Sequence, residues 1–410
     1  MRLAVVVQRY GPEVLGGAET HAALMARLLA RHHSVEVLTT TAHDYQTWRN
    51  HYPEGLTEID GVRVRRFTVA QGRKPSWHAV HRALLDGLDA SRFSNLDPGV
   101  RAAFAARVRA WPEALQEEFI RGQGPIAPGL IQYLQRATFD RVLFVTYLYP
   151  TSYDGLAVVP PSRARIVPTL HDEPPAYLPA FGRRLRRALL LCSTEAEIAL
   201  VSRLYPENPP EARLLGYGIS LPSFDGERDV RVPGEPFLLF AGRVDAHKGI
   251  PELLAWYAAL REVVPRAPRL VLIGERAMPL PRQSGIEARG VVDEEEKIAL
   301  MRHALALVHP SPFESLGIVL LEAMACGTPI VVHGASEVMV EHCRRGRSGV
   351  WVRDGAEFVA AVARLVRDRE LRASLGRNGR DYVEREYSLR AYEARLLAAF
   401  PPGDGAAAEA

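Results

Sequence analysis

Short apolar runs alternate with helical patterns along nearly the whole chain. Runs rich in Val, Ile and Leu predict strands that are buried on both faces, and their alternation with helices predicts parallel sheets wrapped by helices. A helix is predicted over 16–32, where Ala22, Met25 and Leu29 belong to an apolar stripe at helical spacing. In the first half of the chain the predicted strands are 3–8, 35–40, 62–67, 141–147, 164–170, 188–194 and 212–218.

The alternation stops at "PSFDGERDVRVPGEP" (222–236) and then starts again. This segment has three prolines, two glycines and no apolar periodicity, which is typical of a linker. We therefore expect an N-terminal domain over 1–222, a linker over 223–236 and a C-terminal domain over 237–386. In the second domain the predicted strands are 237–242, 269–274, 287–292, 305–310, 329–334 and 349–352, and the predicted helices are 251–264, 293–304, 355–368 and 370–386.

Residues 72–136 are rich in Ala, Arg and Trp and do not follow this rhythm. They predict helices over 78–90, 99–121 and 126–136, and the segment is longer than a simple connection requires. We interpret it as a helical insertion on the first domain. The insertion either helps to bind an acceptor or serves as a purely structural cover.

Composition and charge narrow the class of protein. A length of 410 residues suits two domains. A net charge of +3, without a basic arm or zinc-finger spacing, predicts no nucleic-acid partner. Cys192, Cys326 and Cys343 have no metal-binding spacing and predict reduced thiols, and no apolar run approaches the length needed to span a bilayer. The expectation is a soluble, cytoplasmic, two-domain protein.

The segment "GPEVLGGAET" (11–20) joins the first strand to the first helix. Gly16 and Gly17 allow close approach to the backbone, and the helix amino terminus behind them favours an anion. A tight turn that needs glycine is the alternative. The segment lacks the G-x-G-x-x-G pattern of dinucleotide-binding proteins, which argues against a nicotinamide dehydrogenase.

Two cations follow the first strand of the second domain, in "FAGRVDAHKG" (240–249). Arg243 and Lys248 leave the carboxyl end of that strand five residues apart. Together they can neutralise a diphosphate without a metal ion. Two solvated loop residues are the alternative.

The apolar segment "ESLGIVLLEAMACGTPIVV" (314–332) has one acid at its start and a second acid inside it. If a helix begins near Ser315, Glu314 and Glu322 lie on the order of 10 Å apart along its axis. The free amides of residues 315–317 would then face a diphosphate, Glu322 would accept bonds from a ribose, and Glu314 would lie beside a sugar carbon. The alternative is a helix cap and a surface acid.

These segments resemble one known family. "GGAET", "GRVDAHKG", "GVVDEEEK" and "PSPFESLGIVLLEAMACGTPIVV" are similar, in order and spacing, to the group-1 (GT4-like) retaining glycosyltransferases with the E-x7-E signature. The resemblance implies the GT-B fold, an α/β architecture of two Rossmann-like doubly wound domains facing a central cleft. It also implies a closing helix over 387–400 that packs back on the N-terminal domain. The insertion at 72–136 has no counterpart in the family pattern.

The implied activity is transfer of a sugar from a nucleotide-diphosphate donor to an acceptor hydroxyl, with retention at the anomeric carbon. The acceptor would be a carbohydrate, a lipid-linked glycan or a small molecule, in polysaccharide, glycolipid or glycoside biosynthesis. The resemblance assigns as catalytic residues Glu314, His171, Arg243 and Lys248. As donor-binding residues it assigns Gly16, Gly17, Val292, Ser315, Leu316, Gly317 and Glu322.

Such enzymes use a front-face mechanism in which the leaving phosphate helps to take the acceptor proton, unlike the two-carboxylate glycosidases. No Asp-x-Asp occurs in the sequence, so we expect neither a metal nor another cofactor. The basic run at 181–191 allows peripheral contact with the inner face of the cell membrane, and a solvated basic edge is the alternative. A nucleotide-sugar epimerase of the same fold and a non-catalytic nucleotide-sugar-binding subunit are the other functions considered.

Overall fold

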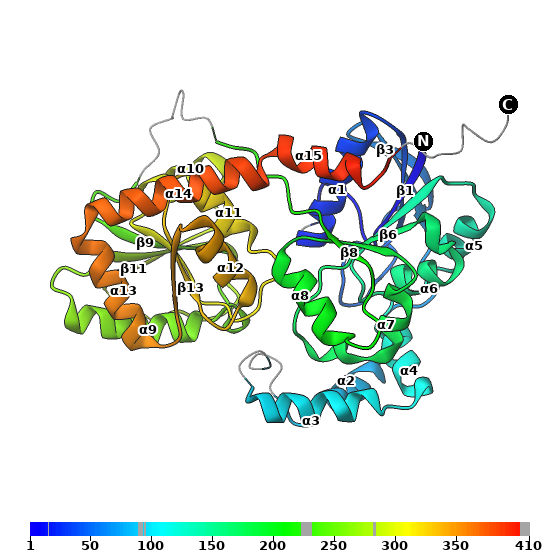
Figure 1. The fold of residues 1–410 in the computed structure, drawn as a ribbon, viewed down its shortest axis with the longest axis horizontal. Coiled ribbons are helices and arrows are strands. Elements are labelled where there is room, and N and C mark those ends of the chain that lie inside the picture. The colour runs from blue at the N-terminus through cyan, green and yellow to red at the C-terminus, as the bar shows by residue number, and fades with distance from the viewer. Residues whose placement is uncertain (15, 89–92, 94–95, 223–231, 282–283, 402–410) are drawn as a thin grey trace. The chain divides into compact units, whose positions relative to one another are not determined.

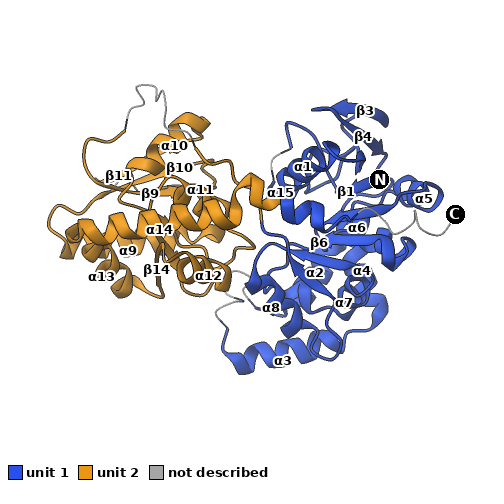
Figure 2. Cartoon of the chain, turned by 45° about the horizontal axis from the view of Figure 1, so that its top comes forward, with its two compact units in different colours: residues 1–216, 393–410 blue, residues 217–392 orange. Residues whose placement is uncertain are grey.

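The chain forms two compact units (Figure 2), one of residues 1–216 and 393–410 and one of residues 217–392. The predicted linker falls within the numbering of the second unit, and its residues 223–231 lie outside the described part of the chain. The computed structural model describes residues 1–14, 16–88, 93, 96–222, 232–281 and 284–401.

The first unit contains an eight-stranded sheet in the order β3-β4-β2-β1-β5-β6-β7-β8 (Figure 1). Neighbouring strands run parallel except β3 and β4, which are antiparallel. All seven predicted strands of this half are present, and β3 is an additional one. The strands are β1 (Arg2–Val6), β2 (Ser34–Thr40), β3 (Gly55–Ile59), β4 (Val62–Phe67), β5 (Arg141–Val145), β6 (Ala164–Val167), β7 (Leu189–Cys192) and β8 (Ala212–Leu214).

The predicted helical insertion forms separate helices. The helix predicted over 99–121 is wrong as one element, because it breaks into α3 and α4 at Pro112, which disfavours helix at the residue before it. Helix α5 packs on β2 and β4 as a crossover helix of the sheet would. The helices of this unit are α1 (Gly17–Ala30), α2 (Trp77–Leu85), α3 (Pro98–Arg109), α4 (Glu113–Gln123), α5 (Pro128–Arg136), α6 (Pro150–Val158), α7 (Pro179–Leu185) and α8 (Glu195–Leu204).

The second unit contains a six-stranded, fully parallel sheet in the order β11-β10-β9-β12-β13-β14. The predicted strands are all present. Helix α12 was not predicted, because its sequence "EVMVEHCRRG" is largely polar. The elements are β9 (Phe237–Ala241), α9 (Ile250–Val263), β10 (Arg269–Ile273), β11 (Ile286–Gly290), α10 (Glu294–His303), β12 (Ala306–His309), α11 (Ile318–Ala325), β13 (Ile330–His333), α12 (Glu337–Gly346), β14 (Gly349–Val352), α13 (Gly355–Arg367), α14 (Arg369–Tyr387) and α15 (Leu389–Ala398).

Helix α15 begins in the second unit and ends in the first. Within the first unit, Glu393 lies 3.4 Å from Arg31, which follows α1, and Arg395 donates to the Leu215 carbonyl at 2.7 Å. The C-terminal half of α15 is therefore attached to the first unit by charged contacts.

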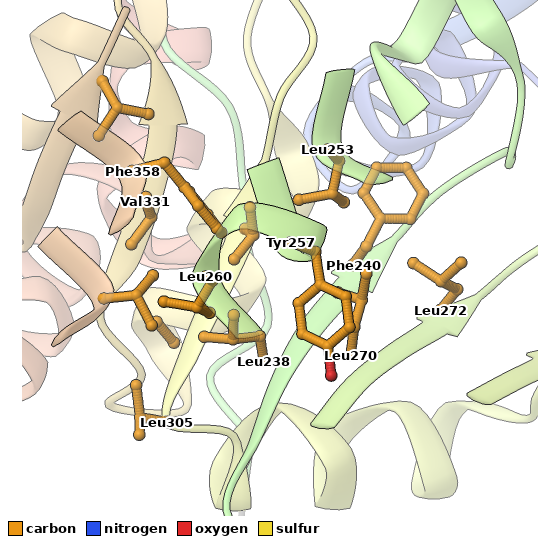
Figure 3. Close-up of a cluster of buried hydrophobic side chains, with 14 of the residues drawn as sticks. Leu238, Phe240, Leu253, Tyr257, Leu260, Leu270, Leu272, Leu305, Val331 and Phe358 are labelled. Atoms are coloured by element: carbon orange, nitrogen blue, oxygen red, sulfur yellow. The ribbon is translucent and has the colours of Figure 1, made fainter. Parts of the chain in front are cut away.

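Apolar side chains fill the space between the second sheet and helices α9 and α13 (Figure 3). Tyr257 and Leu260 of α9 and Phe358 of α13 pack there against alternate strand residues such as Phe240. The intervening strand residues are buried as well, for example Leu239 at 0% exposed, so both faces of the sheet are covered. The covered faces leave the loops at the carboxyl ends of the strands as the places for chemistry.

Candidate active site

Two neighbouring loops of the second unit bring the first pair of predicted site residues together. They follow β9 and β12, which are adjacent in the sheet. Gly249 has φ 74°, and a Cβ there would lie 2.5 Å from the Pro310 carbonyl oxygen, so only glycine permits this approach. The Lys248 Nζ consequently lies 2.6 Å from Glu314 Oε1.

Glu314 accepts a second hydrogen bond, from His309 Nε2 at 2.8 Å. The side chain of Glu314 is only 14% exposed, and burial alone would raise its pKa. The interactions with His309, followed by those with Lys248, outweigh burial and lower the pKa to about 2. Glu314 is therefore a charged group at neutral pH, which the alternative of a simple helix cap does not require.

Arg243 and Lys248 are both held by Asp245. The Asp245 carboxylate pairs with Arg243 Nε, and it accepts the backbone N–H of Lys248 at 2.9 Å as the cap of a short 3-10 helix, η4 (Ala246–Lys248). The Arg243 side chain is 47% exposed and the Lys248 side chain 32%. Asp245 thus fixes the loop that carries both residues, while both side chains stay partly exposed to solvent.

The helix that follows Glu314 begins later than predicted. Helix α11 starts at Ile318, and Gly317 precedes it with φ 70°, a conformation that does not continue a helix. Ser315, Leu316 and Gly317 therefore form a loop before the helix, which corrects the predicted start near Ser315. Glu322 consequently lies about one turn into α11.

The loop is anchored from behind by a buried histidine. The Leu316 carbonyl accepts a hydrogen bond from His342 Nε2 at 2.8 Å, and His342 Nδ1 lies 3.2 Å from the Tyr382 hydroxyl. Burial lowers the pKa of His342 to about 4, so the ring is neutral at pH 7. This contact fixes the backbone orientation of the loop without adding a charge to it.

Glu322 pairs with Lys297 of α10, at 3.0 Å between Nζ and Oε1. Lys297 also contacts Glu294, at 2.9 Å. Burial raises the pKa of Glu322, and the Lys297 ammonium opposes that rise. The described structure does not bring Glu322 into contact with Glu314; the two acids have separate cationic partners.

Val292 lies at the edge of a cavity of about 690 Å³. Arg289 lines the same cavity, and its guanidinium contacts Glu287 at 2.8 Å and Glu296 at 3.0 Å. Val291, next to Val292, is 78% exposed. An apolar and a charged wall therefore meet at this position.

In the first unit, Gly16 precedes α1 with φ 168°, which is extended backbone that any residue adopts. Gly16 leaves no room for a side chain, because a Cβ there would lie 2.2 Å from Glu19 Oε2. A Cβ added at Gly17 would have no atom within 4 Å. The Glu19 carboxylate is neutralised by the buried Arg9, at 2.6 Å. The acid nearest to this loop therefore does not oppose an anion there.

His171 lies in the loop after β6, and its neighbours have specific partners. Asp172 pairs with Arg101 of α3 at 2.6 Å, and Glu173 accepts the Tyr147 hydroxyl at 2.8 Å. The inserted helix α3 is thereby tied to the loop that carries His171.

Two β-branched residues at this edge of the first sheet have positive φ. Thr146, after β5, has φ 62°, and Thr169, after β6, has φ 52°. Positive φ is unfavourable for β-branched residues and often marks functional loops. The buried Glu197 carboxylate accepts the backbone N–H of Leu170 at 2.7 Å and thus helps to hold this loop.

Most of the basic run at 181–191 has partners within the first unit. Arg183 pairs with Glu113 at 2.7 Å, the Arg184 guanidinium lies 4.6 Å from the centre of the Tyr153 ring, and Arg187 donates to the Leu156 carbonyl. These contacts favour a structural edge over a membrane-binding patch. Within the described residues, no helix is both long and apolar enough to cross a bilayer.

Three residues of this site were not predicted from the sequence: His309, Asp245 and Lys297. A signal existed for His309, a polar residue that ends the otherwise apolar strand "ALVH". Asp245 and Lys297 gave no such signal, because acids and lysines are common in exposed loops and helices.

The sequence of this chain is similar to known proteins over part of its length. Residues 226–382 match the family model described as glycosyl transferases group 1. The D-inositol 3-phosphate glycosyltransferase of Streptomyces bingchenggensis is 29% identical over 223 residues, 48% of this chain and 49% of that protein. The chain thus spans about half the length of the curated relatives it matches.

Solved structures of glycosyltransferases match the fold over nearly the whole chain. Sucrose-phosphate synthase from Thermosynechococcus elongatus has a TM-score of 0.67 at 18% identity, over 97% of this chain and 98% of that one. HepE of Anabaena, solved with UDP and glucose, has a TM-score of 0.60 at 15% identity, over 97% and 99%. The predicted fold class is confirmed: the chain has the GT-B fold, and its residues 226–382 match the family model of the group 1 glycosyltransferases.

Proposed function

We propose that this protein is a retaining, metal-independent glycosyltransferase that uses a nucleotide-diphosphate sugar as donor. The observation that carries the proposal is the cluster of Lys248, Arg243 and the ionised Glu314 at the carboxyl edge of the second sheet. Two accessible cations beside a buried carboxylate suit a diphosphate next to a sugar carbon that becomes positive. The group 1 family match over the same residues supports this assignment.

In the proposed reaction, the bond between the anomeric carbon and the diphosphate oxygen breaks, and the acceptor oxygen forms the new bond on the same face. The acceptor proton passes to the leaving phosphate. Arg243 and Lys248 stabilise the charge on the diphosphate, while Glu314 stabilises the positive charge on the sugar. Two protein cations supply the charge that a metal ion would otherwise provide.

The remaining predicted residues take supporting roles in the proposal. The backbone N–H groups of Ser315, Leu316 and Gly317, in the loop held by His342, bind the donor phosphate and sugar. Val292 contacts the base beside its cavity. Glu322 binds the ribose, and His171, Gly16 and Gly17 of the first unit stay predictions from the family resemblance.

A melting-temperature panel tests the proposal directly. The full chain is mixed with UDP, GDP, ADP, dTDP and their common sugar conjugates, with a chelator present. We expect one nucleotide to raise the melting temperature by mass action and its sugar conjugate to release nucleotide when an acceptor is added. A conjugate converted to a different nucleotide sugar without acceptor would indicate an epimerase instead. Binding without any conversion would indicate a non-catalytic subunit.

Replacing Glu322 with alanine is expected to weaken nucleotide binding about 10- to 100-fold, since hydrogen bonds to a charged group contribute roughly 1.5–3 kcal/mol. Isothermal titration with the nucleotide found in the panel measures the effect. Glu294→Ala is the matched control, because Glu294 contacts the same Lys297 ammonium but is 69% exposed. Unchanged affinity in Glu322→Ala would remove Glu322 from the donor site.

A further inference from the structure

His309 is a buried polar residue beside the proposed reaction centre. It ends strand β12, its side chain is 3% exposed, and its ring stacks on Phe240 of the neighbouring strand at 5.9 Å with an interplanar angle of 7°. The ring nitrogen Nε2 lies 2.8 Å from Glu314 Oε1. Because a strand end and a stacked ring fix the imidazole, the position of Nε2 is fixed as well.

The chemistry of the carboxylate decides which group donates the hydrogen bond between His309 and Glu314. Nδ1 of His309 is buried and has no hydrogen-bond partner among the described residues. A carboxylate only accepts hydrogen bonds, so the proton must be on Nε2. His309 therefore donates a hydrogen bond from Nε2 to Glu314 Oε1.

From this geometry we infer that His309 is a positioning residue for Glu314 in the proposed transfer reaction. It holds one carboxylate oxygen in place through a fixed hydrogen bond. The inference rests on the proposed function, since it is the charge of Glu314 beside the sugar that the arrangement preserves.

Glu314 Oε1 accepts two hydrogen bonds, and this gives His309 a second role. Lys248 and His309 both donate to this oxygen. When Lys248 turns to the diphosphate, Glu314 loses its cationic partner. His309 remains as the fixed donor, so Glu314 stays oriented at the moment when its charge is needed.

Two substitutions separate the hydrogen bond from the packing. His309→Gln keeps an N–H donor near the position of Nε2, whereas His309→Leu keeps apolar bulk on Phe240 and removes the donor. His333→Leu is the matched control: His333 ends the next strand, and its ring stacks on Trp256 at 5.9 Å. Turnover of the donor from the panel and affinity for its nucleotide are measured in all three.

We expect His309→Leu to lower kcat about 10- to 100-fold, as loss of orientation does, with nucleotide affinity within about threefold of wild type. His309→Gln should recover most of that loss, and His333→Leu should keep wild-type turnover. Wild-type kcat in a folded His309→Leu would overturn the inference. An equal loss in the Gln and Leu variants would do so too, because packing would then be the cause.

A double-mutant cycle on melting temperature tests the contact without any turnover. His309→Leu should lower the melting temperature of the wild type but not of Glu314→Ala, where the carboxylate is already missing. Equal shifts in both backgrounds would show that His309 does not hold Glu314. A coupled pair in a protein that transfers no sugar from any donor would support the contact and reject the proposed function.

Discussion

The Lys248→Ala variant is expected to bind and fold but to turn over its donor about 10²- to 10³-fold more slowly, a loss of roughly 3–4 kcal/mol of transition-state stabilisation. Lys248 is the cation nearest to Glu314, at 2.6 Å, and its charge would stabilise the departing diphosphate. The fold should survive, because Glu314 keeps its hydrogen bond from His309 and the Lys248 side chain is 32% exposed.

The measurement is kcat at saturating donor, together with the melting temperature. Lys74→Ala is the control, since Lys74 is an exposed lysine of the first unit. Wild-type kcat in Lys248→Ala would reduce this lysine to a structural partner of Glu314. A large fall in melting temperature would attribute the loss to folding instead, and Lys248→Gln, which keeps a donor for Glu314, would then be compared.

The central strands of the sheets were predictable because they are apolar along most of their length. β1 and β9 are buried on both faces and appear in the sequence as uninterrupted apolar runs. β3 was missed because "GLTEI" is largely exposed and polar, as suits a strand at the sheet edge. Helix α12 was missed for a related reason: its buried positions are interleaved with charged ones.

The site was only partly predictable, because its contacts depend on strand order and loop geometry. Lys248 and Glu314 are 66 residues apart and meet because β9 and β12 are neighbours, which no local pattern reveals. The start of α11 was misplaced because Ser315 resembles a helix cap, while the left-handed Gly317 forces the helix to begin after it. The hydrogen bond between His309 and Glu314 could be identified only from the positions of both side chains.

Replacing Glu314 with glutamine should separate the charge of this residue from its shape. Glutamine can still accept hydrogen bonds from His309 and Lys248, but it cannot stabilise a positive sugar carbon. We expect kcat to fall about 10²- to 10³-fold. Nucleotide affinity should stay equal or become tighter, because Lys248 no longer has a carboxylate competing with the diphosphate. Turnover and isothermal titration, with the exposed Glu384→Gln as control, check both parts.

The same variant should change how stability depends on pH. The folded pKa of Glu314 is lowered from 4.5 to about 2, so its ionised form stabilises the fold above about pH 4.5 and this contribution is lost as the pH falls toward 2. The contribution at neutral pH is up to about 3 kcal/mol. The wild type should therefore exceed Glu314→Gln in free energy of unfolding near pH 7, and the difference should shrink below pH 4.5. A difference that is constant over this range would mean that the Glu314 carboxylate is not held in its charged form by Lys248 and His309.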